Sequence, residues 1–366
     1  MSEVNICACC EEAFPENELT EFNGHLYCEE CLDSCTVVCS HCGERIWSED
    51  NAGTDDHPLC QYCYDRNYTH CDHCGMLLNL DDAYSQEDSD ETYCYDCFSR
   101  MNRNRAIHDY YYKPVPIFHG EGPRYMGVEL EIDGGGEDMD NARELLDIAN
   151  QHGENMYCKH DGSLDDGFEL VSHPCTLQYH QTEIPWEDVM HRAVERHYLS
   201  HQAYTCGLHV HVSRKAFGDT EEEQDTCIAR ILYFFEKNWE ELLKFSRRTR
   251  GQLDRWAARY GYKDQPKEVL ETAKKGNLGR YTCVNLCNAD TIEFRIFRGT
   301  LKYNTLIATL QLVDRICDMA LYLTDEEVRQ LTWNVFAEGC QKPELVQYLK
   351  ERRLYVNEPV TAESEV

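Results

Sequence analysis

The sequence predicts an α+β protein with an antiparallel sheet, preceded by small zinc-stabilised modules. Two observations carry this prediction. Paired cysteines fill the first hundred residues, and four segments after residue 124 alternate apolar and polar residues with the period of a β-strand. Helical patterns lie between these segments without regular strand–helix alternation, which favours α+β over a parallel sheet. The 366 residues are enough for two domains.

Twelve of the fourteen cysteines before residue 98 form six CxxC pairs in three repeats. The first cysteines of the repeats, Cys7, Cys39 and Cys71, are 32 residues apart. Two CxxC pairs supply the four thiolates of a tetrahedral zinc site. The predicted ligands are Cys7, Cys10, Cys28 and Cys31, then Cys39, Cys42, Cys60 and Cys63, then Cys71, Cys74, Cys94 and Cys97. We therefore expect about three structural Zn²⁺ ions in residues 1–98, in zinc-ribbon, treble-clef or LIM-like modules.

Disulfides and iron–sulfur ligation are the competing interpretations of these cysteines, and cross-braced pairing between neighbouring CxxC units stays open. Closed Cys₄ sites have no open coordination position and therefore no chemistry of their own. These modules are expected to recruit a partner, such as a protein or peptide substrate.

Charge narrows the classes of partner. The chain carries a net charge of −32, and residues 1–100 hold 23 Asp and Glu against 3 Lys and Arg. Such an acidic region repels phosphate backbones, so we expect no nucleic-acid partner. No apolar run reaches the roughly 20 residues that span a bilayer, and the acidic N-terminus lacks a secretion signal. We expect a cytoplasmic protein without a membrane partner.

Composition also predicts the domain boundaries. Residues 99–123 contain three prolines and two glycines and are expected to be a linker. Residues 124–356 then form the catalytic domain, and residues 357–366 form an acidic tail.

The four alternating segments are "GVELEI" (127–132), "GFELVS" (167–172), "GLHVHVS" (207–213) and "TIEFRIFR" (291–298). Alternate side chains of a strand point to opposite faces. If one sheet buries the apolar faces beneath helices, the other faces form one surface. That surface carries Glu129, Glu131, Glu169, His209, His211, Glu293 and Arg295. A merely solvated face would mix in Lys, Thr and Ser.

Helices are expected at 138–150, 185–198, 220–245, 306–323 and 343–353, with a capping box of Thr220 and Glu223 starting the third. Residues 247–280 hold 10 basic and 4 acidic side chains. This segment is either a solvated surface or an anion clamp and lid, with Arg280 as the best candidate for binding phosphate.

Carboxylates with an occasional histidine are hard ligands, better suited to Mg²⁺ or Mn²⁺ than to a closed zinc site. Such ions beside an arginine indicate phosphate chemistry. No GxxxxGK[ST], HExxH or GxSxG motif is present.

Four motifs in order, "GVELEI", "KHDGSLDDGFELVSHP", "GLHVHVS" and "RYTCVNL…TIEFRIFRGTL", resemble the amidoligases of the glutamine synthetase and glutamate–cysteine ligase superfamily. The resemblance covers residues 124 to about 325. It implies a glutamine-synthetase-like catalytic domain, with a curved antiparallel sheet and flanking helices. It also implies ATP-dependent ligation of a carboxylate to an amine through an acyl-phosphate.

The resemblance assigns roles residue by residue. Glu129, Glu131 and Glu293 would hold Mg²⁺ or Mn²⁺, and Glu169 would complete that shell or position the amine. Arg295 would stabilise the transferring phosphoryl group. His209 and His211 would contact metal or nucleotide, and Arg280 would bind phosphate or a substrate carboxylate. Asp161 and Ser163 would lie on the substrate side, with Asp161 as the base.

Two other classes of function stay open. One is a metal-dependent hydrolase that uses the same Glu and His residues. The other is a non-enzymatic adaptor in which the zinc modules bind a partner and the second domain is a degenerate ligase-like scaffold. Clustered carboxylates repel each other without a cation, which argues against a scaffold.

Overall fold

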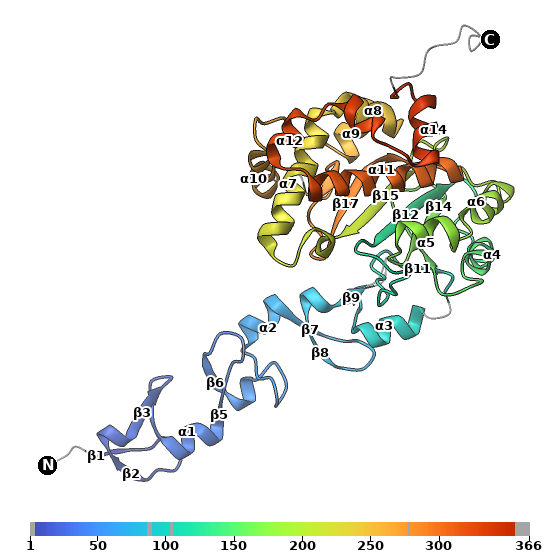
Figure 1. Ribbon diagram of the computed structural model, residues 1–366. Helices are drawn as coiled ribbons and strands as arrows, with labels where there is room; N and C mark the ends of the chain where they lie inside the picture. The colour runs from blue at the N-terminus through green and yellow to red at the C-terminus, as the bar shows by residue number, and fades with distance from the viewer. Residues whose placement is uncertain (1–3, 86–89, 103–104, 277–278, 356–366) are drawn as a thin grey trace, which may run out of the picture. The chain divides into compact units, whose positions relative to one another are not determined.

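The computed structural model describes residues 4–85, 90–102, 105–276 and 279–355 (Figure 1). The chain divides into two compact units, residues 1–104 and residues 105–366. The expected acidic tail, 357–366, lies outside the described residues. Each described helix is either too short or too polar to span a bilayer.

The first unit contains three zinc-knuckle modules with one plan. In each, the first CxxC pair lies in the turn of a short antiparallel hairpin, and the second lies at the start of a helix. Module 1 contains β1 (Val4–Ile6), β2 (Ala13–Pro15), β3 (Leu19–Phe22), β4 (His25–Cys28) and α1 (Glu29–Cys35). Module 2 contains β5 (Thr36–Val38), β6 (Arg45–Trp47) and α2 (Gln61–Asn67). Module 3 contains β7 (Tyr68–His70), β8 (Leu77–Asn79), β9 (Tyr84–Ser85), β10 (Thr92–Tyr93) and α3 (Tyr95–Asn102).

The twelve cysteines gather in three groups of four, each pairing the two CxxC units of one module. Within each group the sulfur atoms lie within 4.8 Å of one another, so the pairing is sequential rather than cross-braced. Burial raises the pKa of the Cys7 thiol, but backbone N–H groups of Cys10, Cys28 and Cys9 oppose burial and lower it to about 6. The pKa values of Cys39 and Cys71, which occupy the same position of the repeat, are lowered to about 6 in the same way. Neighbouring thiols and burial raise the pKa values of Cys31, Cys63 and Cys97, the last cysteines of the three groups. The three sites fit structural Zn²⁺ because four sulfur atoms converge in each.

Neighbouring modules share their small cores. Trp47 of module 2 packs edge-to-face against Phe22 and Tyr27 of module 1, with ring centroids 4.9 and 5.4 Å apart. Tyr68 and Leu77 of module 3 pack in the same way against the buried cluster of module 2. Each of the first two cores is therefore completed by a hairpin of the next module.

A seven-stranded sheet forms the centre of the second unit. Its order is β11 (Ile107–His108), β13 (Met156–Lys159), β14 (Gly167–Ser172), β12 (Met126–Asp133), β15 (Gly207–Ser213), β17 (Thr291–Arg298) and β16 (Val284–Asn285). Every neighbouring pair is antiparallel except β11 and β13, which are parallel. The expected α+β architecture with a largely antiparallel sheet is confirmed.

The helices of the second unit include all five expected segments, one of them broken in two, and several helices that were not expected. The helices are α4 (Met139–Ala149), α5 (Leu177–Thr182), α6 (Trp186–Glu195), α7 (Glu221–Lys237), α8 (Trp239–Ser246), α9 (Arg250–Trp256), α10 (Pro266–Lys275), α11 (Tyr303–Tyr322), α12 (Asp325–Gln330), α13 (Trp333–Glu338) and α14 (Pro343–Glu351). The capping box of Thr220 and Glu223 is present. The single helix expected over 220–245 is wrong, because Asn238, at φ −108° and ψ 34°, leaves helical geometry and separates α7 from α8.

One hydrophobic core contains the apolar side chains of the four alternating strands together with residues of α7 and α11. Val128, Val210 and Phe294 are fully buried there. Figure 1 shows α11 running across these strands. Because this face is closed by helices, the polar side chains of the same strands line the opposite face.

The segment 99–123 differs from the expected linker. Its first residues belong to α3, and Ile107–His108 adds a strand to the edge of the sheet. His108 stacks on Tyr112 with a centroid distance of 3.7 Å. The residues from 105 onward therefore form part of the second unit, although their prolines and glycines are typical of a linker.

Candidate functional site

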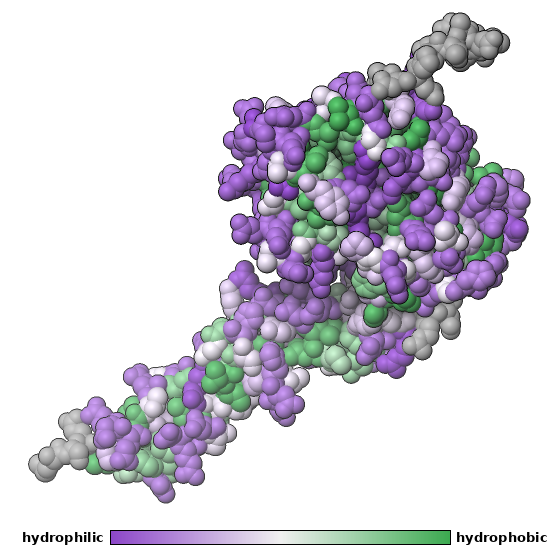
Figure 2. Space-filling view, viewed as in Figure 1, coloured by the Kyte–Doolittle hydropathy of each residue, from purple (hydrophilic) through white to green (hydrophobic). Residues whose placement is uncertain are grey.

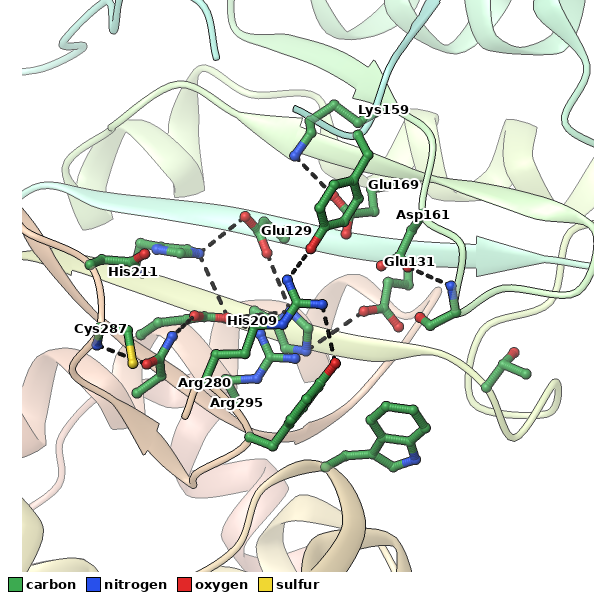
Figure 3. A pocket seen from close by; sticks show the side chains of 18 of the residues that line it. Glu129, Glu131, Lys159, Asp161, Glu169, His209, His211, Arg280, Cys287 and Arg295 are labelled. Carbon is green, nitrogen blue, oxygen red and sulfur yellow. Dashed lines mark hydrogen bonds and ion pairs between the residues drawn. The ribbon is translucent and has the colours of Figure 1, made fainter. Parts of the chain in front are cut away.

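A cavity of about 620 Å³ lies over the polar face of the central strands (Figure 3). All ten residues expected there, from Glu129 to Arg295, line it. They are Glu129, Glu131, Asp161, Ser163, Glu169, His209, His211, Arg280, Glu293 and Arg295. Six carboxylates and six Lys or Arg side chains in total line this one cavity.

The register of the sheet places these side chains in rows across the strands. Lys159, Glu169 and Glu131 lie opposite one another on β13, β14 and β12. Glu129 of β12 lies opposite His209 of β15. His211, Glu293 and Asn285 form a further row on β15, β17 and β16. Opposite residues of an antiparallel pair have Cβ atoms roughly 5 Å apart, so each row brings its functional groups within contact.

Two histidines connect two of the carboxylates. His211 Nε2 lies 3.2 Å from Glu129 Oε1 and 4.0 Å from Glu293 Oε1. His209 Nδ1 lies 3.3 Å from Glu129 Oε2 and 3.6 Å from Glu293 Oε1. The four side chains form one compact polar group at the centre of the cavity floor.

Glu293 is held from two further directions. Arg295 pairs with its Oε1, and the Asn285 side chain donates a 2.7 Å hydrogen bond to its Oε2. Arg295 follows Glu293 by two residues on the same strand, so both side chains point to the same face. The guanidinium therefore lies beside the carboxylates, where a transferring phosphoryl group would need a cation.

A second acidic group lies next to the first. Glu131, Asp161 and Glu169 each place an oxygen within 4.8 Å of the others. Lys159 Nζ lies 3.9 Å from Glu169 Oε2. Ser163 donates its backbone N–H to Asp161 Oδ1 at 2.7 Å, and this contact fixes the loop that carries both residues.

The environment separates the pKa values of these acids. Burial raises the pKa of Glu129, but His211 and His209 overcome burial and hold it well below its usual range. The pKa of Glu293 is lowered for the same reason. Burial raises the pKa of Glu169 well above its usual range, and the neighbouring charges of Glu129 and Asp161 raise it further. Around Glu169, the negative charge of the carboxylates therefore exceeds the positive charge that the cavity's own side chains supply.

This donor set fits divalent ions such as Mg²⁺ or Mn²⁺. Glu129, His211 and Glu293 form one group of converging ligand atoms, and Glu131, Asp161 and Glu169 form another. Among the described residues, no donor makes a hydrogen bond to the buried Oε2 of Glu169. Carboxylate oxygens are the ligands these ions prefer, and a cation here would relieve the mutual repulsion.

Arg280 is at the rim of the cavity and already has partners. Its guanidinium donates to the hydroxyl groups of Tyr110 and Tyr281. It also lies over both rings, 5.6 and 5.2 Å from their centroids. Tyr110 comes from the segment expected to be a linker.

Sequence reasoning missed several lining residues, among them Tyr110, Lys159, Arg248, Trp256 and Asn285. Lys159 is the first residue of the motif that contains Asp161, and that motif was the available signal, while the structure places Lys159 opposite Glu169. Arg248 lies in the basic segment 247–280 but carried no signal of its own. Asn285 and Tyr110 reach the cavity through tertiary contacts that no local pattern announces.

Comparison with known proteins agrees with the motifs. Residues 147–317 match the family model described as "Putative amidoligase enzyme". The match includes Asp161, Ser163, Glu169, His209, His211, Arg280, Glu293 and Arg295 and begins after Glu129 and Glu131. No curated protein gives a significant match.

Among solved structures, a bifunctional glutathione synthetase from Pasteurella multocida is similar over 63% of this chain and 46% of its own, with a TM-score of 0.35 and 12% identity. This chain thus spans less than half of that protein, and a similarity at this level carries no argument about function. The resemblance to the amidoligases is confirmed by the family match over residues 147–317.

Proposed function

We propose that the second unit is an ATP- and Mg²⁺-dependent carboxylate–amine ligase that proceeds through an acyl-phosphate. One observation carries this proposal: two clusters of candidate metal ligands line the same cavity as several arginines. The clusters are Glu129, His211 and Glu293, and Glu131, Asp161 and Glu169. A nucleotide triphosphate bound with divalent ions requires both kinds of charge. The family match supports a ligase at the level of reaction class.

In this proposal Glu129, Glu131 and Glu293 hold Mg²⁺ or Mn²⁺, with His209 and His211 beside metal or nucleotide. The bound ions would neutralise charge on the ATP phosphates. A substrate carboxylate attacks the γ-phosphorus, ADP leaves, and an acyl-phosphate forms. Arg295 stabilises the charge on the transferring phosphoryl group, a contribution of about 3 kcal/mol for a preorganised donor.

The amine then attacks the acyl carbon, phosphate leaves, and the nitrogen loses a proton. Asp161 is the proposed base. Burial raises its pKa, yet hydrogen bonds from Glu169 and Ser163 lower it overall, so the carboxylate is ionised and can hold an ammonium group. Glu169 lies beside it and positions the same amine. We also propose that the sheet corresponds to the curved sheet of glutamine synthetase, and that segment 247–280 acts as a lid that excludes water from the acyl-phosphate.

The zinc modules recruit the partner in this account, and we propose a protein or peptide substrate. Figure 2 shows hydrophobic residues among hydrophilic ones on the first unit. Ile6 at 64%, Tyr62 at 66% and Met76 at 53% exposure are large apolar side chains open to contact. Apolar contacts within an acidic surface favour a polypeptide over a nucleic acid.

The test is a screen for ATP consumption over amines and carboxylates, including peptides, with product identification by mass spectrometry. We expect consumption only with Mg²⁺ or Mn²⁺ and a suitable pair of substrates. Glu293→Gln and Arg295→Ala should each lower turnover by roughly 100-fold or more while the protein stays folded.

Matched controls come from Glu240 and Arg250, an exposed pair at 2.6 Å outside the cavity. Glu240→Gln and Arg250→Ala should leave turnover unchanged. Full turnover in both cavity variants would refute the ligase assignment. Metal-dependent hydrolysis without ATP would instead favour the hydrolase.

A further inference from the structure

The cationic side chains of the cavity differ in whether an internal partner already satisfies them. Arg295 pairs with Glu293, and Lys159 lies beside Glu169. Arg280 donates to two tyrosine hydroxyl groups. Among the described residues, the side chains of Lys113, Arg248 and Arg255 make no hydrogen bond or ion pair, although they line the same cavity. Lys113 and Arg255 are exposed to solvent, whereas Arg248 is half-buried.

The backbone fixes Arg248 firmly. Helix α8 ends at Ser246 and is capped by Arg247, whose φ of 63° is left-handed, and the N–H of Arg248 donates a 3.2 Å hydrogen bond to Ser246 Oγ. These contacts set the direction in which the side chain of Arg248 leaves the chain. The backbone therefore directs this side chain toward the cavity that it lines.

A glycine makes room for this guanidinium. A Cβ added to Gly207 would lie 2.5 Å from Nη2 of Arg248 and 2.8 Å from Nε2 of His209. It would also lie 3.4 Å from Oε2 of Glu131, which accepts the N–H of Gly207. The cation thus sits next to a candidate metal ligand without forming an ion pair with it.

Arg248 is half-buried, and a partly desolvated guanidinium without a partner is unfavourable. Burial lowers the pKa of Arg248 to about 10, with Arg295 and Arg298 acting in the same direction and Glu131 opposing them. A fork of N–H donors is suited to two oxygens of a carboxylate or phosphate group. An incoming oxyanion would satisfy the donors and balance the neighbouring arginines.

We infer that Arg248 is the oxyanion-binding residue of this cavity, receiving a carboxylate or phosphate group of a substrate beside Glu131. This inference rests on the proposed function. It assigns to Arg248, which lacks a partner, the binding of phosphate or carboxylate that was expected of Arg280. The two sources of the oxyanion are the triphosphate of ATP and the carboxylate of the second ligand.

Calorimetry on the full chain tests the inference with two probes in Mg²⁺ buffer, the nonhydrolysable ATP analogue AMP-PNP and the dicarboxylate glutarate. Arg248→Gln should weaken binding of at least one probe by tenfold or more. Weaker binding of AMP-PNP would show that Arg248 binds a phosphate group, and weaker binding of glutarate would show that it binds the substrate carboxylate. The control Arg250→Gln, on the exposed start of α9, should bind both probes within twofold of the wild type.

Thermal unfolding without ligand separates binding from structure. Arg248→Met removes a desolvated charge at similar volume, so its melting temperature should equal or exceed that of the wild type. A lower melting temperature, or failure of the variants to fold, gives Arg248 a structural role and overturns the inference. So do unchanged affinities in Arg248→Gln, or a wild type that binds neither probe.

The outcome is separable from that of the ligase proposal. If the wild type consumes ATP and Arg248→Gln binds both probes normally, the ligase proposal stands and the role of Arg248 is refuted. If the protein binds an oxyanion through Arg248 but does not consume ATP, the binding role of Arg248 stands and the ligase proposal is refuted.

Discussion

Histidines in this protein serve opposite purposes according to their surroundings. Burial lowers the pKa of His211, but Glu129 and Glu293 overcome burial and raise it, so the ring shares the charge of the cavity floor. His180 is fully buried and lies in α5 without a carboxylate among its hydrogen-bond partners. Its Nε2 donates to the Met126 carbonyl at 3.0 Å, and its Nδ1 accepts from Trp186 at 3.4 Å. Both nitrogens are occupied only in the neutral ring.

His180 predicts a specific acid sensitivity. Burial lowers its pKa from 6.5 to about 4, while the Met126 contact opposes this shift. In the unfolded chain the ring gains a proton below pH 6.5, and in the folded protein it does so only near pH 4. Stability is therefore complete above pH 6.5 and is lost as the pH falls toward 4. The loss between pH 7 and pH 5 is about 2 kcal/mol.

The comparison of wild type with His180→Gln isolates this effect, because all other groups titrate in both. Urea unfolding followed by tryptophan fluorescence suits the second unit, which holds four of the five tryptophans. The variant should start less stable at pH 7 and lose about 2 kcal/mol less than the wild type by pH 5. Parallel pH profiles for the two proteins would contradict the assignment.

Among elements, strands with a strict alternation were predictable and loops were not. Glu129, Glu169, His209, His211 and Glu293 could be placed on one face because a period of two leaves no other choice. Their partners Asn285 and Tyr110 depend on the strand order and on segment 105–123, which local composition misassigned as a linker. The break at Asn238 was likewise invisible, because the apolar stripe of the α7 segment continues into α8.

Shared cores between modules predict coupling along the first unit. Trp47→Ala removes two edge-to-face aromatic contacts from module 1, at a cost of about 1–3 kcal/mol. The wild type should contain close to three zinc ions per chain by metal analysis. In the variant, one of the three should pass to a chelator at a lower chelator concentration than in the wild type, because metal binding and folding of a module are linked.

Identical chelation curves for the two proteins would show that module 1 closes without Trp47. A zinc content near zero in the wild type would remove the zinc modules altogether. The exposed Tyr62→Ala serves as the control, since it lies in module 2 away from this contact and should retain all three ions.

At the scale of the whole molecule, the chain divides into two units with separate cores, and we propose that the first recruits a partner and the second carries the chemistry. The first unit was predictable from cysteine spacing alone, because a closed Cys₄ site dictates its ligands. The cavity was predictable in both histidines and most carboxylates but only partly in its cations, because Arg280 and Arg295 were expected whereas Lys159 and Arg248 were not. Arg248 lies beside Glu131 because Gly207 leaves space for it, and that packing follows from tertiary structure.

The central claim is that a substrate carboxylate is activated by phosphoryl transfer from ATP. The most direct measurement uses ¹⁸O-labelled carboxylate substrates with Mg²⁺, ATP and an amine acceptor, followed by mass spectrometry of the inorganic phosphate. An acyl-phosphate transfers one carboxylate oxygen to the departing phosphate, so we predict one ¹⁸O per phosphate in step with amide formation. Amide product accompanied by unlabelled phosphate, or peptide cleavage without ATP, would contradict the account.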